Sequence, residues 1–538
     1  MQKTCKQCEI KFEIDQLDLD FYKKINVPVP TLCSECRLKR RQIFRNDRVF
    51  YNRKCDLSGK QFISTYEPNR GYKVYHPDEW YSDKWDAMVY GRDFDFNKPF
   101  FEQFDALMHA VPRLGIDIVN CENSYYCNFC GDDKNCYLDI AGEGNEDCYF
   151  NLFVKHSKNV VDCTFVYNST LCCECINCYD CYNVQHSTYC ENSSDCLFCF
   201  DLKGCRNCLF SSGLRNKEYF IFNKQHSKEE YGKYLENLQL GSYVQREKLK
   251  AGWDKFKREN AIFRGNYFLN CENVSGDDIK NSKNTFHSFN VLNCEDCKYL
   301  YDVLDAKDCQ DLNYSLYKPE LSYELISTLN MVKSAFSLES HYCNEVYYCD
   351  MVNNSKNLFG CIGLNHKQYC ILNKQYSREE YEKLVPKIIE KMRLDGEWGE
   401  FFPFDISPFA YSETVAQEYF SLKVERTKSE KIYQGPEFQL PDNIKDLPDD
   451  LVKQILICEK SEKPYRVIEA ELKFYKRMNI PVPHLSPDQR HLERMSLRNP
   501  RKLFDRKCSN CGQQIESTFT ANRPEKVYCE QCYLKVVY

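Results

Sequence analysis

The sequence predicts a mainly β protein with helical insertions, in which a cysteine-rich parallel β-helix, or solenoid, in two segments is flanked by zinc-ribbon modules. Three observations predict this fold. The two ends of the chain match each other, short apolar strings recur through the middle, and cysteines at both ends come as C-x-x-C pairs.

The two ends are copies of one module. Residues 5–75 align with residues 458–528 without a gap, and 28 of the 71 aligned positions are identical. Phe21-Tyr22-Lys23 matches Phe474-Tyr475-Lys476, and Pro28-Val29-Pro30 matches Pro481-Val482-Pro483. This match indicates an internal duplication, so each copy shows which cysteines the other copy has lost.

Each copy keeps a different four-cysteine set. The first copy has Cys5, Cys8, Cys33 and Cys36, which align with Cys458, Ser461, Ser486 and Gln489. The second copy has Cys508, Cys511, Cys529 and Cys532, which align with Cys55, Ser58, His76 and Glu79. Two C-x-x-C pairs supply the tetrahedral sulfur shell of structural zinc, and the 17-residue spacer between Cys511 and Cys529 is typical of zinc ribbons. We therefore expect about two zinc ions per chain and no metal at Cys55, His76 and Glu79.

Composition favours a cytoplasmic protein. The 538 residues include 34 cysteines, a density that also occurs in secreted disulfide proteins. However, Met1 is followed by a polar stretch rather than an apolar signal sequence, and no run of about 20 apolar residues predicts a membrane span. The net charge of −6 does not favour a nucleic-acid-binding protein as a whole.

A basic segment follows the first cysteine set. Residues 33–55 hold eight Lys and Arg against two acids. A helix here would present a basic face that could contact nucleic-acid phosphates. The candidate contacts are Arg37, Lys39, Arg40, Arg41, Arg45 and Arg48. The alternative is that these arginines form ion pairs within the protein.

The middle of the chain predicts stacked short strands. Strings such as Asp147-Cys148-Tyr149-Phe150 and Asn207-Cys208-Leu209-Phe210 recur every 9 to 15 residues and are bounded by turn formers. The repeated Asn/Asp-Cys-aromatic order favours a parallel β-helix over a sandwich. Its cysteines could bind metal or an iron–sulfur cluster, but we favour a packing role because a C-x-x-C pair in a strand points to opposite faces.

The solenoid unit occurs twice, and a helix follows each copy. Lys217-x-Tyr219-x-Ile221-x-Asn223-Lys224-Gln225 returns as Lys367-x-Tyr369-x-Ile371-x-Asn373-Lys374-Gln375. Capping boxes come next, at Ser227 with Glu230 and at Ser377 with Glu380. The predicted helices run to about Asn260 and over about 377–393.

These observations predict eight segments. They are a ribbon module (1–80), an aromatic and helical connector (81–119), the first solenoid segment (120–225), a helix (226–262), the second solenoid segment (263–376), a helix (377–395), an aromatic and linker segment (396–450) and the second ribbon module (451–538).

The chain resembles a group of cysteine-rich proteins of candidate-phyla-radiation (Patescibacteria) bacteria that carry zinc-ribbon modules at both ends. The resemblance rests on Cys36-Arg37-x-x-Arg40-Arg41, on the segments 80–86 and 90–96, and on the segments 396–403 and 407–411. The first module is also similar to a short bacterial zinc-ribbon domain. Neither resemblance implies an activity. The group has cysteines where Ser461, Ser486 and Gln489 stand here, so this chain departs from the pattern at that site.

The sequence favours a non-catalytic, zinc-binding scaffold that docks a protein partner on the solenoid face. Association with nucleic acid or ribosomes through the basic helices is the main alternative. A β-helix carbohydrate-active enzyme, with acids such as Asp93, Asp95, Asp117 and Asp139, is less favoured because no nucleophile–base pair stands out. A thiol-rich metal or redox protein is the fourth interpretation.

Overall fold

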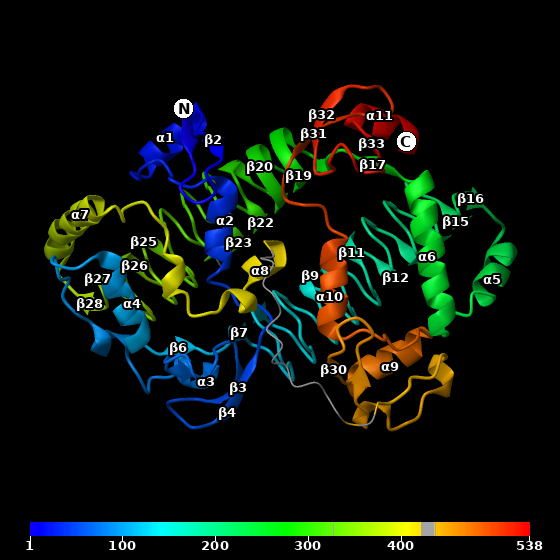
Figure 1. Cartoon of the computed structure of the whole chain (residues 1–538), viewed down its shortest axis with the longest axis horizontal. Coiled ribbons are helices and arrows are strands. Elements are labelled where there is room, and N and C mark those ends of the chain that lie inside the picture. The colour runs from blue at the N-terminus through cyan, green and yellow to red at the C-terminus, as the bar shows by residue number, and fades with distance from the viewer. Residues whose placement is uncertain (327, 421–434, 436) are drawn as a thin grey trace. The chain divides into compact units, whose positions relative to one another are not determined.

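The structure is a computed structural model that describes residues 1–326, 328–420, 435 and 437–538. Part of the predicted 396–450 segment therefore lies outside the described residues. The fold is mixed α/β, with many short, mostly parallel strands in small sheets (Figure 1). The prediction of short parallel strands is confirmed, whereas the amount of helix makes the chain mixed rather than mainly β.

The chain forms two compact units. Unit 1 comprises the described parts of residues 1–116, 266–423 and 501–503, and unit 2 comprises those of residues 117–265, 424–500 and 504–538. Each unit therefore contains one terminal module and one segment of short parallel strands. No helix among the described residues is long and apolar enough to cross a membrane.

The module of unit 1 contains two hairpins, each followed by a helix. Its elements are β1 (Gln2–Thr4), β2 (Lys11–Glu13), α1 (Gln16–Lys24), α2 (Ser34–Gln42), β3 (Tyr51–Lys54), β4 (Gln61–Ser64), β5 (Val74–Tyr75) and α3 (Pro77–Trp80). The connector that follows contains η1 (Ala87–Tyr90), α4 (Phe100–Ala110) and β6 (Arg113–Leu114). Strand β6 pairs in parallel with β5, and α4 is buried through Phe100, Phe104 and Leu107.

The module of unit 2 repeats this order. Its elements are β29 (Leu456–Ile457), β30 (Pro464–Tyr465), α9 (Glu469–Met478), α10 (Pro487–Ser496), β31 (Phe504–Lys507), β32 (Gln514–Ser517), β33 (Lys526–Tyr528) and α11 (Glu530–Val537). Two short 3-10 turns, η4 (Ile444–Asp446) and η5 (Leu451–Lys453), precede it. Strand β33 pairs in parallel with β17 (Ile262–Arg264).

Residues 117–225 of unit 2 form a parallel ladder, which we call the first ladder. In its parallel pairs, each residue lies opposite the residue twelve positions later, as Thr164 lies opposite Ile176 and Ser194 lies opposite Arg206. Isolated bridges continue the same offset between the named strands. The parallel strands are β7 (Ile118–Val119), β8 (Cys130–Gly131), β9 (Leu152–Lys155), β10 (Thr164–Tyr167), β11 (Ile176–Tyr179), β12 (Tyr182–Gln185), β13 (Ser194–Leu197), β14 (Arg206–Leu209) and β15 (Glu218–Ile221). The last strand, β16 (Lys224–Gln225), pairs antiparallel with β15.

A left-handed residue at every third position shapes the first ladder. Asp162 and Phe165, for example, have φ of 55° and 56°, and the residues that follow them, Cys163 and Val166, are fully buried. Each left-handed residue turns the backbone, so that every third side chain points inward and four of them fill one twelve-residue repeat. Asn and Asp tolerate this conformation best, which explains why they so often precede a buried cysteine.

This geometry corrects the expectation that C-x-x-C pairs point to opposite faces. Cys172, Cys175 and Cys178 are three residues apart and all fully buried, because the left-handed residue between each pair returns the side chains to the same side. Within the described part of the chain, the groups of three or more potential ligands made of cysteine alone are the two terminal sets. Inward cysteines such as Cys172, Cys175 and Cys178 therefore pack as small apolar side chains.

Residues 266–375 of unit 1 form the second ladder. Its offset is also twelve in most pairs, but it is eleven between Phe268 and Ile279 and thirteen between Ser315 and Thr328. The strands are β18 (Phe268–Leu269), β19 (Glu272–Lys280), β20 (Lys283–Leu292), β21 (Glu295–Lys298), β22 (Tyr301–Leu304), β23 (Asn313–Leu316), β24 (Thr328–Leu329), β25 (Asn344–Tyr347), β26 (Lys356–Phe359), β27 (Gln368–Ile371) and β28 (Lys374–Gln375).

Both predicted capping boxes are present at the helices that follow the ladders. Ser227 and Glu230 cap α5 (Lys228–Glu236), and Ser377 and Glu380 cap α7 (Arg378–Asp395). The first helix was expected to run to about Asn260, but it does not. It ends at Glu236, and α6 (Tyr243–Asn260) begins anew because Ser242 caps it by accepting a hydrogen bond from the Gln245 amide.

The aromatic segment after α7 packs within unit 1. It contains η2 (Phe404–Ile406), η3 (Tyr411–Glu413) and α8 (Val415–Tyr419). The Phe402 ring lies 4.8 Å from the Phe104 ring of α4, and Glu397 accepts hydrogen bonds from the Phe100 and Phe101 amides at the start of that helix. The segment thus fixes the connector to the unit.

Candidate metal centres

The four predicted cysteines of the first module form one cluster. The β1–β2 hairpin carries Cys5 and Cys8, and Cys33 and Cys36 lie at the start of α2, where Cys33 is the N-cap residue. All four sulfur atoms lie within 4.8 Å of one another, and the Cys8 and Cys33 sulfurs are 3.7 Å apart. Zinc–sulfur bonds of about 2.3 Å in a tetrahedron require sulfur separations of about 3.8 Å. The cluster therefore fits one zinc ion.

The predicted cysteines of the second module form the same arrangement. Cys508 and Cys511 lie on the turn of the β31–β32 hairpin, and Cys529 is the N-cap residue of α11, which also carries Cys532. The four sulfurs lie within 4.8 Å of one another, with 3.8 Å between Cys511 and Cys529. Four sulfur ligands leave no open position for water or substrate, so the site suits structural rather than catalytic zinc.

Backbone N–H groups prepare one thiolate in each cluster. Burial raises the pKa of Cys5, but N–H donors of Cys33, Cys8 and Gln7 outweigh it and lower the pKa to about 6. The same balance lowers the pKa of Cys508 to about 6. By contrast, burial raises the pKa of Cys33 to about 11. One sulfur per site is thus an anion at neutral pH before metal arrives, since hydrogen bonds to the charged form favour it.

The four hairpin turns share one geometry, whether or not their cysteine set is complete. In each turn, the backbone N–H of the first cysteine donates to the carbonyl of the residue five positions later, and the cysteine carbonyl accepts from the amide of the residue four positions later. The amide and carbonyl partners are Glu9 and Ile10, Gly59 and Lys60, Glu462 and Lys463, and Gly512 and Gln513. The residue four positions after the cysteine has a positive φ in all four turns. The turn therefore survives without its full ligand set.

The positions that have lost cysteines now act in helix capping and ion pairing. His76 accepts a hydrogen bond from the Asp78 amide at the start of α3, and Glu79 forms an ion pair with Lys84 at 2.7 Å. In the second module, Ser486 caps α10 by accepting from the Gln489 amide. The helix starts of the two incomplete cysteine sets are thus capped by His76 and Ser486, and a serine cap such as Ser486 is worth about 1 kcal/mol.

The basic residues of α2 lie inside unit 1. Arg37 pairs with Asp311 of the second ladder at 2.6 Å, and Arg41 pairs with the same carboxylate at 3.4 Å. Arg40 pairs with Glu324 at 3.1 Å and with Glu400 at 2.9 Å. Although burial lowers the pKa of Arg37, these acids raise it well above its usual value. The guanidinium groups hold the module to the ladder, which is the intramolecular alternative to phosphate contact.

The same clamp recurs in unit 2. In the alignment of the two modules, Arg490 and Arg494 occupy the positions of Arg37 and Arg41. Both pair with Asp162 of the first ladder, at 2.9 and 2.6 Å. Asp162 and Asp311 are both left-handed residues of their ladders, with φ of 55° and 65°. We call each of these sets, two arginines on one left-handed aspartate, an arginine clamp.

The other residues predicted to contact nucleic acid are less uniform. Arg45 is buried and pairs with Asp47 at 3.0 Å. Lys39 is half-buried, with its ammonium 5.4 Å from the centre of the Tyr411 ring, and Arg48 is half-buried. Four of the six predicted contacts are thus buried in intramolecular ion pairs, and nucleic-acid contact stays a prediction.

Helix α11, which follows Cys529 and carries Cys532, also contacts the ladder of its unit. The Tyr533 hydroxyl of α11 donates to Asp201 of the first ladder, and Arg215 pairs with the same carboxylate at 2.9 Å. These aspartates could not be identified from the sequence, because each lies more than a hundred residues from its partner in the module. Their place as left-handed residues before an inward side chain is shared by other aspartates of the ladders and does not single them out.

A third group of potential ligands lies inside the first ladder. Carboxylate oxygens of Asp133 and Asp139 and the sulfur of Cys136 lie within 4.8 Å of one another, and all three residues are buried. Of the acids weighed for an enzyme, Asp139 thus belongs to this group. Asp93 instead forms an ion pair with Lys374 at 2.6 Å, and Asp95 accepts from the Asn97 amide before α4.

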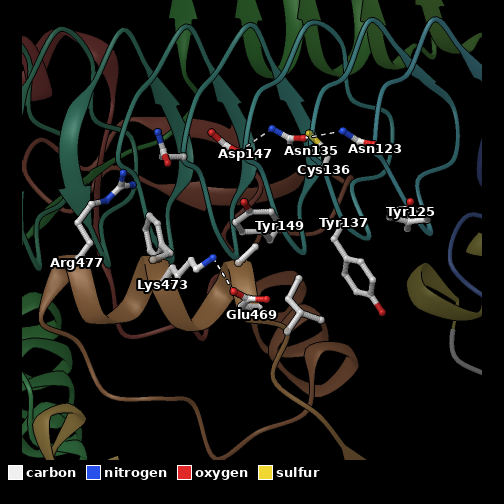
Figure 2. A pocket seen from close by; sticks show the side chains of 14 residues that line it. Asn123, Tyr125, Asn135, Cys136, Tyr137, Asp147, Tyr149, Glu469, Lys473 and Arg477 are labelled. Carbon is white, nitrogen blue, oxygen red and sulfur yellow. Dashed lines mark hydrogen bonds and ion pairs between the residues drawn. The ribbon is translucent and has the colours of Figure 1, made fainter. Parts of the chain in front are cut away.

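A cavity of about 540 Å³ lies in unit 2 between the first ladder and α9 (Figure 2). On the ladder side, one column of tyrosines recurs at twelve-residue spacing. Beside it runs a column in which Asn123 donates to Asn135 at 3.5 Å and Asn135 donates to Asp147 at 3.3 Å. On the helix side, Lys473 pairs with Glu469 at 2.7 Å, and the Arg477 guanidinium lies 5.7 Å from the Phe474 ring centre. We call this cavity the tyrosine groove; the tyrosines are Tyr125, Tyr137 and Tyr149.

Comparison with known proteins adds little to this geometry. No family model and no curated protein matches the chain. The solved structures that match include one described as a candidate acetyltransferase from Desulfovibrio desulfuricans G20, with 9% identity and a TM-score of 0.11. That match covers 45% of this chain and 64% of the other, so this chain spans less than two thirds of its length. A likeness at this score carries no argument about fold or function.

Proposed function

We propose that the chain is a non-catalytic, zinc-dependent scaffold that binds a protein partner. In this proposal each terminal four-cysteine cluster holds one zinc ion, and each ladder is a closed β-solenoid. The observation that carries the proposal is that each cluster lies at the start of a helix whose side chains make buried contacts with a ladder aspartate. These are α2 with Asp311 and α11 with Asp201. Zinc would order the helix start and so hold the module in place.

The two units should differ in which helix stays packed on its ladder when zinc is removed. In unit 1, the zinc-bearing helix α2 also carries the arginine clamp. In unit 2, the clamp is on α10, whose start is capped by Ser486, and zinc belongs to α11. Loss of zinc should therefore release α2 in unit 1 but only α11 in unit 2. This difference between the units would show that zinc orders these helices and is not only bound at the clusters.

Hydrogen exchange measured by mass spectrometry tests the proposal with Cys8→Ser and Cys511→Ser. We expect Cys8→Ser to remove protection from α2, and Cys511→Ser to remove it from β31, β32 and α11 while α10 stays protected. Cys121→Ser, at a half-buried ladder cysteine outside both clusters, is the control and should change neither module. Unchanged protection in both cluster variants would contradict the structural role of zinc.

We infer that the tyrosine groove is the partner surface. Tyrosine and arginine are enriched at protein interfaces and at their energetic centres, and the cavity volume falls within the range of ligand sites. The rim carries both signs of charge, from Lys473, Arg477, Glu469 and Asp147. Such a rim suits a peptide segment more than a polyanion.

Peptide display against the whole chain tests this surface. Selected peptides should lose binding at least tenfold with Tyr137→Ser, which lines the groove, and keep it with Tyr182→Ser, an exposed ladder tyrosine outside it. Peptides that bind all three proteins equally would place the partner surface elsewhere. Peptides that bind only in low salt and compete with RNA would favour the nucleic-acid alternative.

A further inference from the structure

The inward positions of one repeat of the first ladder carry only potential metal ligands. Residues 130–141 place Cys130, Asp133, Cys136 and Asp139 inside, and their exposed fractions are 5, 1, 1 and 0%. In the next repeat, the positions of the two aspartates are held by Asn145 and Asn151. The acidic pair is therefore confined to one level of the ladder, where no water-exposed surface screens its charge.

The two carboxylates face a common space. Their Oδ2 atoms each lie 2.7 Å from the point where a Cβ on Gly142 would stand, and Asn145 Nδ2 lies 2.9 Å from it. Gly142 occupies an inward position and fills none of this space. Any larger residue there would collide with both carboxylates, so the absence of a side chain leaves room between them for a small ligand.

One carboxylate oxygen has no partner. Asp133 Oδ1 accepts a hydrogen bond from the Asn145 amide at 2.9 Å, whereas Asp133 Oδ2 accepts none from the described residues. The neighbouring Cys130 sulfur lies 3.1 Å from the Asp139 carbonyl oxygen and 3.4 Å from the Asn128 carbonyl oxygen, and its single proton is shared among these acceptors and the Asp133 carboxylate. No Lys, Arg or His in the described part of the chain forms an ion pair with Asp133. A buried carboxylate without a counter-charge is costly, so a cation or a proton must balance it.

We propose that Asp133, Cys136 and Asp139 bind a divalent metal ion, best suited to zinc, inside the first ladder. Zinc accepts carboxylate oxygen at about 2.0–2.2 Å and thiolate sulfur at about 2.3 Å, distances that ligand atoms within 4.8 Å of one another can reach by small side-chain rotations. Two carboxylates and a thiolate favour zinc over magnesium or calcium, which prefer oxygen alone. Cys130 is placed to complete the shell. This site is independent of the two terminal clusters.

The ion would be trapped during folding, because all of its ligands are buried. The protein is therefore refolded with excess zinc, desalted, and assayed for metal by mass spectrometry. The matched variant is Asp133→Asn with Asp139→Asn, which copies the asparagines of the next repeat and so should fold. We expect the variant to hold one zinc ion fewer than the wild type.

Cobalt gives a second readout. In protein refolded with Co²⁺, Cys136→Ala should lower the intensity of the thiolate-to-cobalt band without changing the two terminal sites, which Cys8→Ser and Cys511→Ser report separately. Equal metal content in the wild type and the asparagine variant, whose folding is checked by urea titration, would overturn the proposal. That result would indicate that Asp133 and Asp139 share a proton and bind no metal ion.

Discussion

The arginine clamp of unit 2 gives the sharpest test of how a module is held to its ladder. Asp162→Asn removes the negative charge between Arg490 and Arg494 but keeps the size of the side chain and its tolerance of a left-handed backbone. At separations of 2.6 and 2.9 Å, each ion pair has a gross attraction of about 6 kcal/mol at an effective dielectric constant of 20.

The net effect is smaller than this attraction because burying the charges has already cost solvation. Breaking a buried pair by removing one partner typically costs about 3–5 kcal/mol. Glu471 would still face Arg490 at 3.0 Å, while among the described residues Arg494 would keep its hydrogen bond to the Phe150 carbonyl and no ion pair. We therefore expect the free energy of unfolding of unit 2 to fall by about 3–5 kcal/mol.

Urea titration followed by hydrogen exchange in α10 measures this loss. The midpoint for α10 should fall by about 1–2 M, given typical urea dependences. Asp180→Asn is the control, because Asp180 is an exposed aspartate of the same ladder that accepts one hydrogen bond from Asn168. It should shift stability by less than about 0.5 kcal/mol. An α10 midpoint equal to that of the wild type would refute the clamp.

Three further predictions follow from the structure. Because the pKa of Cys5 and of Cys508 is lowered to about 6, both sulfurs are already ionised at pH 7.5. Calorimetry in two buffers should therefore find fewer than four protons released per zinc ion at pH 7.5, and about one more per site at pH 5.5. Equal proton release at the two pH values would contradict the lowered pKa values. Gly276→Ala should destabilise unit 1 by at least about 2 kcal/mol in urea titration, since φ of Gly276 is 138° and a Cβ there would lie 1.7 Å from the Ser288 carbonyl oxygen. The control, Gly252→Ala on α6, should stabilise unit 2 by about 0.5–1 kcal/mol. Equal effects of the two substitutions would contradict the close approach at Gly276. Replacing the clamp with Asp162→Leu, Arg490→Met and Arg494→Leu, together with Glu471→Gln so that no buried carboxylate loses its cation, should recover most of the stability lost in Asp162→Asn, and a further loss would indicate a role beyond charge pairing.

The sequence was most informative where the chemistry is local. Cysteine spacing predicted both four-cysteine clusters, and Ser227 and Ser377 marked two helix starts, because these features depend on residues within one turn or hairpin. A packing role for the ladder cysteines was predicted, but the two cysteines of a C-x-x-C pair were wrongly predicted to point to opposite faces. A period of two was assumed, while a left-handed residue such as Asp162 at every third position imposes a period of three. The sequence carried this signal as Asn or Asp before cysteine.

The partners of the buried arginines could not be read from the sequence. Arg37 and Asp311 are separated by 274 residues, and nothing local distinguishes Asp311 from the other aspartates of the ladder. The basic stretch of α2 therefore pointed outward to phosphate as readily as inward to a carboxylate. Only the fold shows that Arg37 and Arg41 share one buried acid.

Metal content per chain of the wild type, Cys8→Ser, Cys511→Ser and the double variant tests the central claim most directly. The proteins are purified under reducing, chelator-free conditions. If each terminal cluster holds one zinc ion, each single variant contains one ion fewer than the wild type and the double variant two fewer, whatever the ladder binds. Unchanged zinc in the single variants would contradict the assignment of both clusters.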